Sequence, residues 1–99
     1  MRVELFYFDG CPHWSVAHDR LREAMRAVGR DDRAVLRHEV LTPAQAEAIG
    51  FTGSPTIRVN GKDPFATVED RIGFACRIYR TPTGFDGSPT VAQFVEALA

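Results

Sequence analysis

The stretch VELFYFDGCPHW (Val3–Trp14) decides the fold. Its first six residues are rich in β-branched and aromatic side chains and lack polar alternation, which predicts a strand covered on both faces. Gly10 then suits a turn, and Pro12 suits the first position of a helix. The stretch therefore predicts a strand that leads directly into a helix, with a cysteine, Cys11, at the junction.

Working outward, the same signals predict three more strands and two more helices. Apolar residues at helical spacing carry the first helix as far as Gly29, which predicts its C-terminal stop. The second helix has Thr42 as its N-cap and ends at Gly50, and the last helix has Ser88 as its N-cap and Pro89 at its first position. The predicted order is β-α-β-α-β-β-α, with the later elements at Arg33–Leu41, Pro43–Ile49, Ser54–Gly61, Gly73–Arg80 and Pro89–Leu98. Residues 61–70 receive no element, and residues 81–87 are predicted to be a plain loop.

Composition favours one ordinary globular domain over residues 1–99. Hydrophobic residues make up 44% of the chain and charged residues 25%, and the formal net charge is −1. No basic stripe favours nucleic acid as a partner, and no apolar run reaches the length of a membrane span. The N-terminus lacks a signal-peptide pattern, so we expect a cytoplasmic protein whose two cysteines are reduced at rest. Two cysteines and three scattered histidines show no metal-ligand spacing, so no metal or cofactor is expected.

The element order, together with GCPHW (Gly10–Trp14) and FTGSPT (Phe51–Thr56), resembles the thioredoxin-like superfamily over almost the whole chain. The resemblance implies a four-stranded mixed sheet flanked by helices and a cis peptide bond between Ser54 and Pro55, facing Cys11. It also implies that Ser54, Pro55 and Thr56 line a substrate groove in which an extended chain pairs like an extra strand.

Two narrower resemblances concern the cysteine. Cys-Pro-His resembles the active site of the strongly oxidising, disulfide-forming branch of the family, with Trp14 in the place of the second cysteine. The chain is also similar to small bacterial thioredoxin-like proteins, some of which are labelled alkylmercury lyases.

The residues around Cys11 predict an activated thiol. A sulfur at a helix N-terminus faces unpaired N–H groups and the positive end of the helix dipole, and both favour the thiolate. Pro12 sets the first turn, and His13 is placed to donate to the sulfur or to add positive charge. We therefore expect a lowered pKa for Cys11. Trp14 has two interpretations, an apolar wall for a substrate or simple core packing.

Cys76 is expected to be a bystander. With a strand period of two, it shares a face with Phe74 and Ile78, which predicts a buried thiol. The predicted topology places Cys76 on the order of 10 Å or more from Cys11, by strand rise, so no bond between them is expected at rest. By the same topology, the 61–73 loop lies at the far end from Cys11.

Two classes of function follow. The leading one is a single-thiol redox protein, a monothiol thiol–disulfide oxidoreductase in which Cys11 exchanges disulfides or becomes glutathionylated. Because Trp14 replaces the second thiol of the motif, the resolving thiol is then external, on a low-molecular-weight thiol or another protein. The alternative is a thiol-based binding module for soft metal ions or organomercurials, or a non-catalytic thioredoxin-like partner domain. The oligomeric state stays open.

Overall fold

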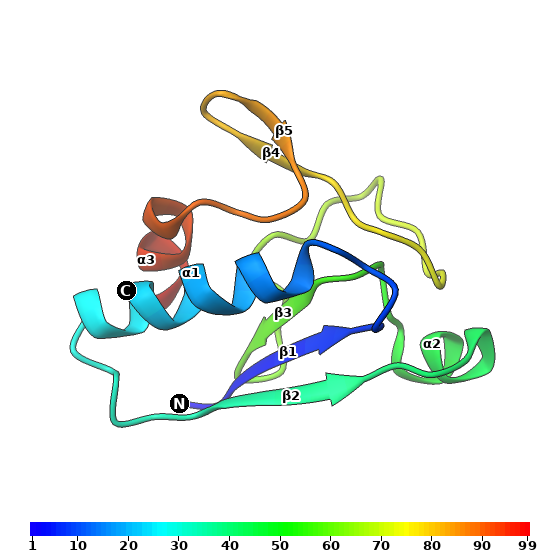
Figure 1. The fold of residues 1–99 in the computed structure, drawn as a ribbon, viewed down its shortest axis with the longest axis horizontal. Coiled ribbons are helices and arrows are strands. Elements are labelled where there is room, and N and C mark those ends of the chain that lie inside the picture. The colour runs from blue at the N-terminus through cyan, green and yellow to red at the C-terminus, as the bar shows by residue number, and fades with distance from the viewer.

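The computed structural model describes residues 1–99 as an α/β fold with three helices and two small sheets (Figure 1). The elements in order are β1 (Val3–Tyr7), α1 (Trp14–Ala27), β2 (Val35–Glu39), α2 (Pro43–Ile49), β3 (Thr56–Val59), β4 (Tyr79–Thr81), β5 (Gly84–Asp86) and α3 (Val91–Leu98). None of the helices has the length and apolar character that crossing a bilayer requires.

The larger sheet has three strands in the order β2-β1-β3, with β1 parallel to β2 and antiparallel to β3. The smaller sheet is the hairpin β4–β5, which projects from the rest of the molecule (Figure 1). Part of this arrangement was predicted, since the first three strands and all three helices occur in the expected order.

The prediction of a four-stranded sheet was wrong. The predicted fourth strand, Gly73–Arg80, touches the β3 region through a single bridge between Cys76 and Ser54. Arg77, the next residue, is bound by Asp63 and by the Phe65 carbonyl, so this segment is tied to the preceding loop rather than running along β3. The end of the segment forms β4, which pairs with β5. The stretch 81–87, predicted to be a plain loop, therefore contains β5.

Two hydrophobic clusters cover the larger sheet on its two faces. The main core joins the sheet to α1 and α3, which lie side by side on one face (Figure 1), and it consists of Val3, Leu5, Ala17, Leu21, Ala24, Met25, Ile57, Phe94 and Leu98. The second cluster includes α2 and contains Phe6, Val40, Ala46 and Phe51. Leu5 and Phe6 are consecutive and both buried, which confirms that β1 is covered on both faces.

The predicted C-terminal ends of α1 and α2 and the predicted N-cap of α2 are confirmed. Gly29 follows the end of α1 with a positive φ of 74°, and Gly50 ends α2 with a φ of 68°. The Thr42 hydroxyl accepts the N–H of Gln45, while the Gln45 side chain accepts the N–H of Leu41. These reciprocal bonds satisfy donors that the start of α2 leaves free.

Two helix starts were predicted two residues too early. In α1 the N-cap is His13, so Pro12 precedes the helix. In α3 the N-cap is Thr90 rather than Ser88, because Thr90 and Gln93 form a complete capping box. Such a box satisfies two backbone donors at once, which neither Ser88 nor Pro89 does here.

Candidate functional site

Cys11 lies between β1 and α1 and is only 2% exposed. Its backbone N–H donates to the Phe8 carbonyl (3.1 Å), and its thiol donates to the Ser54 carbonyl (Sγ–O 3.4 Å). Since α1 begins at Trp14, the sulfur sits just before the helix rather than in its first turn. The sequence therefore located the thiol at the right junction but placed it too close to the helix.

His13 is turned away from the role predicted for it. Its exposed ring lies against Gly87, where a Cβ atom would come within 2.2 Å of the ring carbon Cγ. No hydrogen bond joins His13 to the Cys11 sulfur. The glycine gives the imidazole a flat backbone surface to rest on, and the contact brings the loop after β5 onto the start of α1.

Trp14 packs against the main core, which is one of the two roles considered for it. Its ring stacks on Tyr7 with the centroids 4.2 Å apart, and both side chains pack against the main core while remaining half-buried. Because Tyr7 ends β1 and Trp14 begins α1, the stack joins the two elements on either side of Cys11. It sets the geometry of the turn that carries the thiol.

The peptide bond between Ser54 and Pro55 is cis, as predicted. The groove predicted at Ser54, Pro55 and Thr56 is absent, because all three residues are buried. The Tyr79 hydroxyl donates to the Pro55 carbonyl, and the Thr56 hydroxyl donates to the carbonyl of Gly53. The chain itself covers the surface that the sequence assigned to a substrate.

Cys76 is the main correction to the predicted site. It is exposed rather than buried, and it pairs with Ser54, the residue whose carbonyl accepts the Cys11 thiol. The prediction of a distant Cys76 failed because the segment does not continue as a strand of the larger sheet. The 61–73 loop begins at the far end from Cys11, where Lys62 pairs with Val59, as predicted, but it ends beside the site, where Gly73 donates to the Phe51 carbonyl.

Cys11 influences the ionisation of the Cys76 thiol. The pKa of the Cys76 thiol is raised, first because the sulfur is partly shielded from water and then by the neighbouring Cys11 side chain. A negative Cys11 disfavours a second negative sulfur beside it, and it favours keeping the proton on Cys76.

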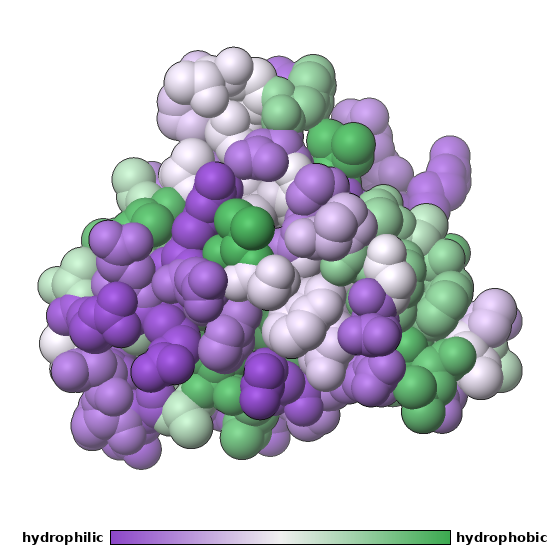
Figure 2. All heavy atoms as spheres, in the orientation of Figure 1, coloured by the Kyte–Doolittle hydropathy of each residue, from purple (hydrophilic) through white to green (hydrophobic).

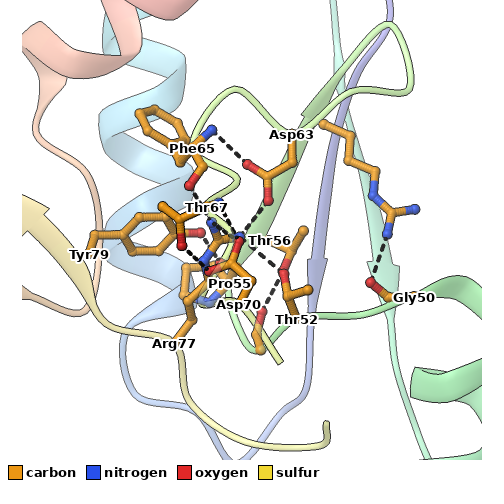
Figure 3. A network of polar contacts seen from close by, with 12 residues as sticks. Gly50, Thr52, Pro55, Thr56, Asp63, Phe65, Thr67, Asp70, Arg77 and Tyr79 are labelled. Atoms are coloured by element: carbon orange, nitrogen blue, oxygen red, sulfur yellow. Dashed lines mark hydrogen bonds and ion pairs between the residues drawn. The ribbon is translucent and has the colours of Figure 1, made fainter. Parts of the chain in front are cut away.

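Arg77 holds Cys76 in place through a network that sequence reasoning missed (Figure 3). The side chain of Arg77 is 5% exposed and forms ion pairs with Asp63 (2.5 Å) and Asp70 (3.6 Å). It also donates to the Thr52 hydroxyl (3.2 Å) and the Phe65 carbonyl (2.9 Å), and its guanidinium stacks on the ring of Tyr79. A signal was present in the sequence: one arginine stands in an otherwise apolar segment, after a loop with spaced aspartates.

Gly53 allows this segment to approach Ser54 closely. Its φ is +114°, and a Cβ atom there would lie 2.9 Å from the Cβ of Arg77 and 3.1 Å from the carbonyl oxygen of Ala75. We expect Gly53→Ala to lower the free energy of unfolding by about 2–4 kcal/mol, since backbone strain adds to a clash with backbone atoms.

Gly84→Ala is the matched control for this prediction. Gly84 also has a positive φ, +128°, but its Cβ would meet nothing within 4 Å. Urea denaturation of both variants separates the strain that they share from the contact that only Gly53 makes. Equal losses in the two variants would show that the close approach to Arg77 does not matter.

A broad hollow on the surface lies apart from both thiols. It measures about 640 Å³ and is an open groove between α1 and the start of β2, in a region where Figure 2 shows hydrophilic side chains gathered. Half-buried His18 lies in it, with its pKa lowered by burial and then by Arg37 and Arg22. No group of three or more His, Cys, Asp and Glu side chains is placed to hold a metal ion anywhere in the chain.

Two cysteines, one buried and one exposed, lie at Ser54: the Cys11 thiol donates to the Ser54 carbonyl, and Cys76 forms a backbone bridge with Ser54. Comparisons with protein-family models, with curated proteins and with solved structures found no match.

Proposed function

We propose that the protein exchanges thiols and disulfides, with Cys11 and Cys76 as its two reacting groups. The observation that carries the proposal is that both cysteines meet at Ser54, whose carbonyl accepts the Cys11 thiol and whose backbone forms a bridge with Cys76. In this proposal Cys76 supplies within the chain the second thiol that the sequence analysis assigned to an external partner. An external disulfide is then reduced to two thiols while Cys11 and Cys76 become a disulfide, a two-electron exchange that needs no cofactor.

Other features support the proposal without carrying it. The chain has a cis bond at Ser54–Pro55, a cysteine at the first strand-to-helix junction and the strand order β2-β1-β3. A thioredoxin-like fold that has lost its fourth strand from the sheet accounts for these features together. This fold assignment is part of the proposal.

A redox titration tests the proposal. The reduced protein is equilibrated with glutathione buffers of increasing potential, quenched with acid and alkylated, and its disulfides are mapped by mass spectrometry. We expect one intramolecular Cys11–Cys76 disulfide in the wild type and none in Cys11→Ser or Cys76→Ser. A wild-type protein that stays reduced, or that links only to other copies, would overturn the proposal.

The raised pKa of Cys76 gives a prediction of its own. Two of its causes come from Cys11, so Cys11→Ala should shift the pH midpoint for alkylation of Cys76 by iodoacetamide to a lower value. The matched comparison is Cys11→Ser, which keeps a hydrogen-bonding group but lacks the charge, and should shift the midpoint less. An unchanged midpoint in both variants would show that the thiols do not interact.

The alternative function is binding of a soft metal ion between the two thiols. Paired thiolates suit such ions, and the placement of Cys11 and Cys76 at the same residue, Ser54, favours this function. Hg(II) titration distinguishes it: a binding protein should take up one ion per chain with both cysteines required, yet should form no Cys11–Cys76 disulfide at any glutathione potential. The appearance of that disulfide would favour thiol–disulfide exchange over metal-ion binding.

A further inference from the structure

The backbone of Ser54 is already fully engaged by the chain itself. Its N–H donates to the Ala75 carbonyl (2.8 Å), and its carbonyl accepts the N–H of Arg77 (2.9 Å) as well as the Cys11 thiol. An extended protein substrate that paired at this edge would need the same N–H and C=O groups. The segment 73–77 occupies the position that such a substrate would take.

This internal segment is firmly anchored. Gly73 donates to the Phe51 carbonyl (2.9 Å), and Phe74 stacks on Phe8 with ring centroids 4.6 Å apart. At its other end stands the buried Arg77 network of Figure 3. Removing the segment to admit another strand would leave Asp63 and Asp70 without their cation, which is costly for partly buried charges.

Only one of the two thiols is open to a large or small reagent from outside. Cys11 is 2% exposed, whereas Cys76 is exposed. Attack on a disulfide requires the sulfur to approach along the S–S axis, and a covered sulfur has no such path. The exposed thiol is therefore the one that an external disulfide meets.

The raised pKa of Cys76 works against this order but does not reverse it. Each unit of increase lowers the thiolate fraction about tenfold and raises the nucleophilicity of the thiolate about threefold, so the net loss is roughly threefold per unit. The burial of Cys11, which keeps an external disulfide away from its sulfur, is a stronger effect than the lower thiolate fraction of Cys76, because burial acts at every pH.

We infer, on the basis of the proposed function, that the substrates are disulfides of low-molecular-weight thiols and that Cys76 attacks them first. Cys76 loses its proton to solvent and attacks one sulfur of RS–SR, forming a Cys76–S–SR bond and releasing RS⁻, which takes up a proton. Cys11 then loses its proton and attacks the Cys76 sulfur, forming the Cys11–Cys76 bond and releasing the second RS⁻. Two protein thiols are oxidised and one external disulfide is reduced to two thiols.

The test compares the two single-cysteine variants with oxidised glutathione as the probe. We expect Cys11→Ser to form a stable mixed disulfide on Cys76 at least ten times faster than Cys76→Ser forms one on Cys11. Equal rates, or faster reaction at Cys11, would overturn the order of attack. Serine in place of cysteine changes the side-chain volume little. Quenching the wild type at early times gives the same information, because the transient mixed disulfide should map to Cys76.

A second arm tests the substrate class with the wild type. The probe is an extended peptide whose single central cysteine carries glutathione, and its rate of reduction is compared with that of oxidised glutathione. We expect the small disulfide to react at least tenfold faster, and comparable rates would overturn the assignment to small disulfides. If the wild type forms no internal disulfide with either probe, the proposed function itself fails, an outcome separate from the other two.

Discussion

Arg77→Met is expected to lower the free energy of unfolding by about 3 kcal/mol. The side chain of Arg77 is 5% exposed, and its loss leaves Asp63 and Asp70, which are 13% and 22% exposed, without their cation. Removing one partner of a buried ion pair typically costs about 3–5 kcal/mol, and the lower value applies because both carboxylates retain some contact with water. Methionine keeps much of the volume, so the loss reports charge and hydrogen bonding more than packing.

Arg80→Met is the matched control for this variant. Arg80 is exposed and stands over the ring of Phe85, with no ion pair. Its replacement should change stability by less than about 0.5 kcal/mol, as is usual for surface sites. Urea denaturation measures both variants. Similar losses in the two would show that the Arg77 network does not hold the 61–77 region together.

Oxidation of the wild type should raise the free energy of unfolding by about 2–4 kcal/mol. A Cys11–Cys76 disulfide closes a loop of about 65 residues, and the chain-entropy estimate for that length is about 4 kcal/mol, less any strain in the folded state. Guanidinium denaturation with and without reductant measures the difference between the two redox forms.

Cys76→Ser provides the control for the oxidation experiment. It lacks one thiol, so exposure to oxidised glutathione should leave its stability within about 0.5 kcal/mol of the reduced variant. A wild-type protein that is not stabilised by oxidation would indicate that the disulfide forms only by distorting the fold. That outcome would argue against two thiols placed for exchange.

Local signals in the sequence predicted the regular part of the fold well. The β1 strand, the stop of α1 at Gly29 and the Thr42 cap of α2 each depend on a few neighbouring residues, and their physical causes are visible in the sequence. The cis bond at Ser54–Pro55 came from the family resemblance and not from a local signal.

The second half of the chain was less predictable because its structure depends on distant partners. Alternation around Cys76 indicates a strand, but whether that strand joins the sheet depends on where Arg77 finds its carboxylates. A period-two pattern shows which residues share a face of a strand, but it does not show that the arginine is buried. Once Arg77 is tied to the loop at Asp63, the segment makes one bridge to Ser54 and then continues into the β4–β5 hairpin.

Only part of the candidate site was predicted, because the rest depends on contacts between distant parts of the chain. Cys11, Ser54 and Pro55 lie together as expected, because they sit at the ends of neighbouring strands of the larger sheet. The burial of Cys11 and the exposure of Cys76 were not foreseen, and the exposure of Cys76 goes with the departure of its segment from the larger sheet. The sequence located the junction that carries Cys11, and long-range ion pairs of Arg77 hold the segment that carries Cys76.

The most direct test of the central claim, that Cys11 and Cys76 face each other as a pair, is arsenical binding to the reduced protein. A trivalent arsenical such as phenylarsine oxide bridges two neighbouring thiols, and a single thiol holds it only weakly against a competing monothiol. With excess mercaptoethanol present, native mass spectrometry should show one arsenical retained per wild-type chain and none on Cys11→Ser or Cys76→Ser. Loss of the arsenical from the wild type as readily as from the single-cysteine variants would contradict the account.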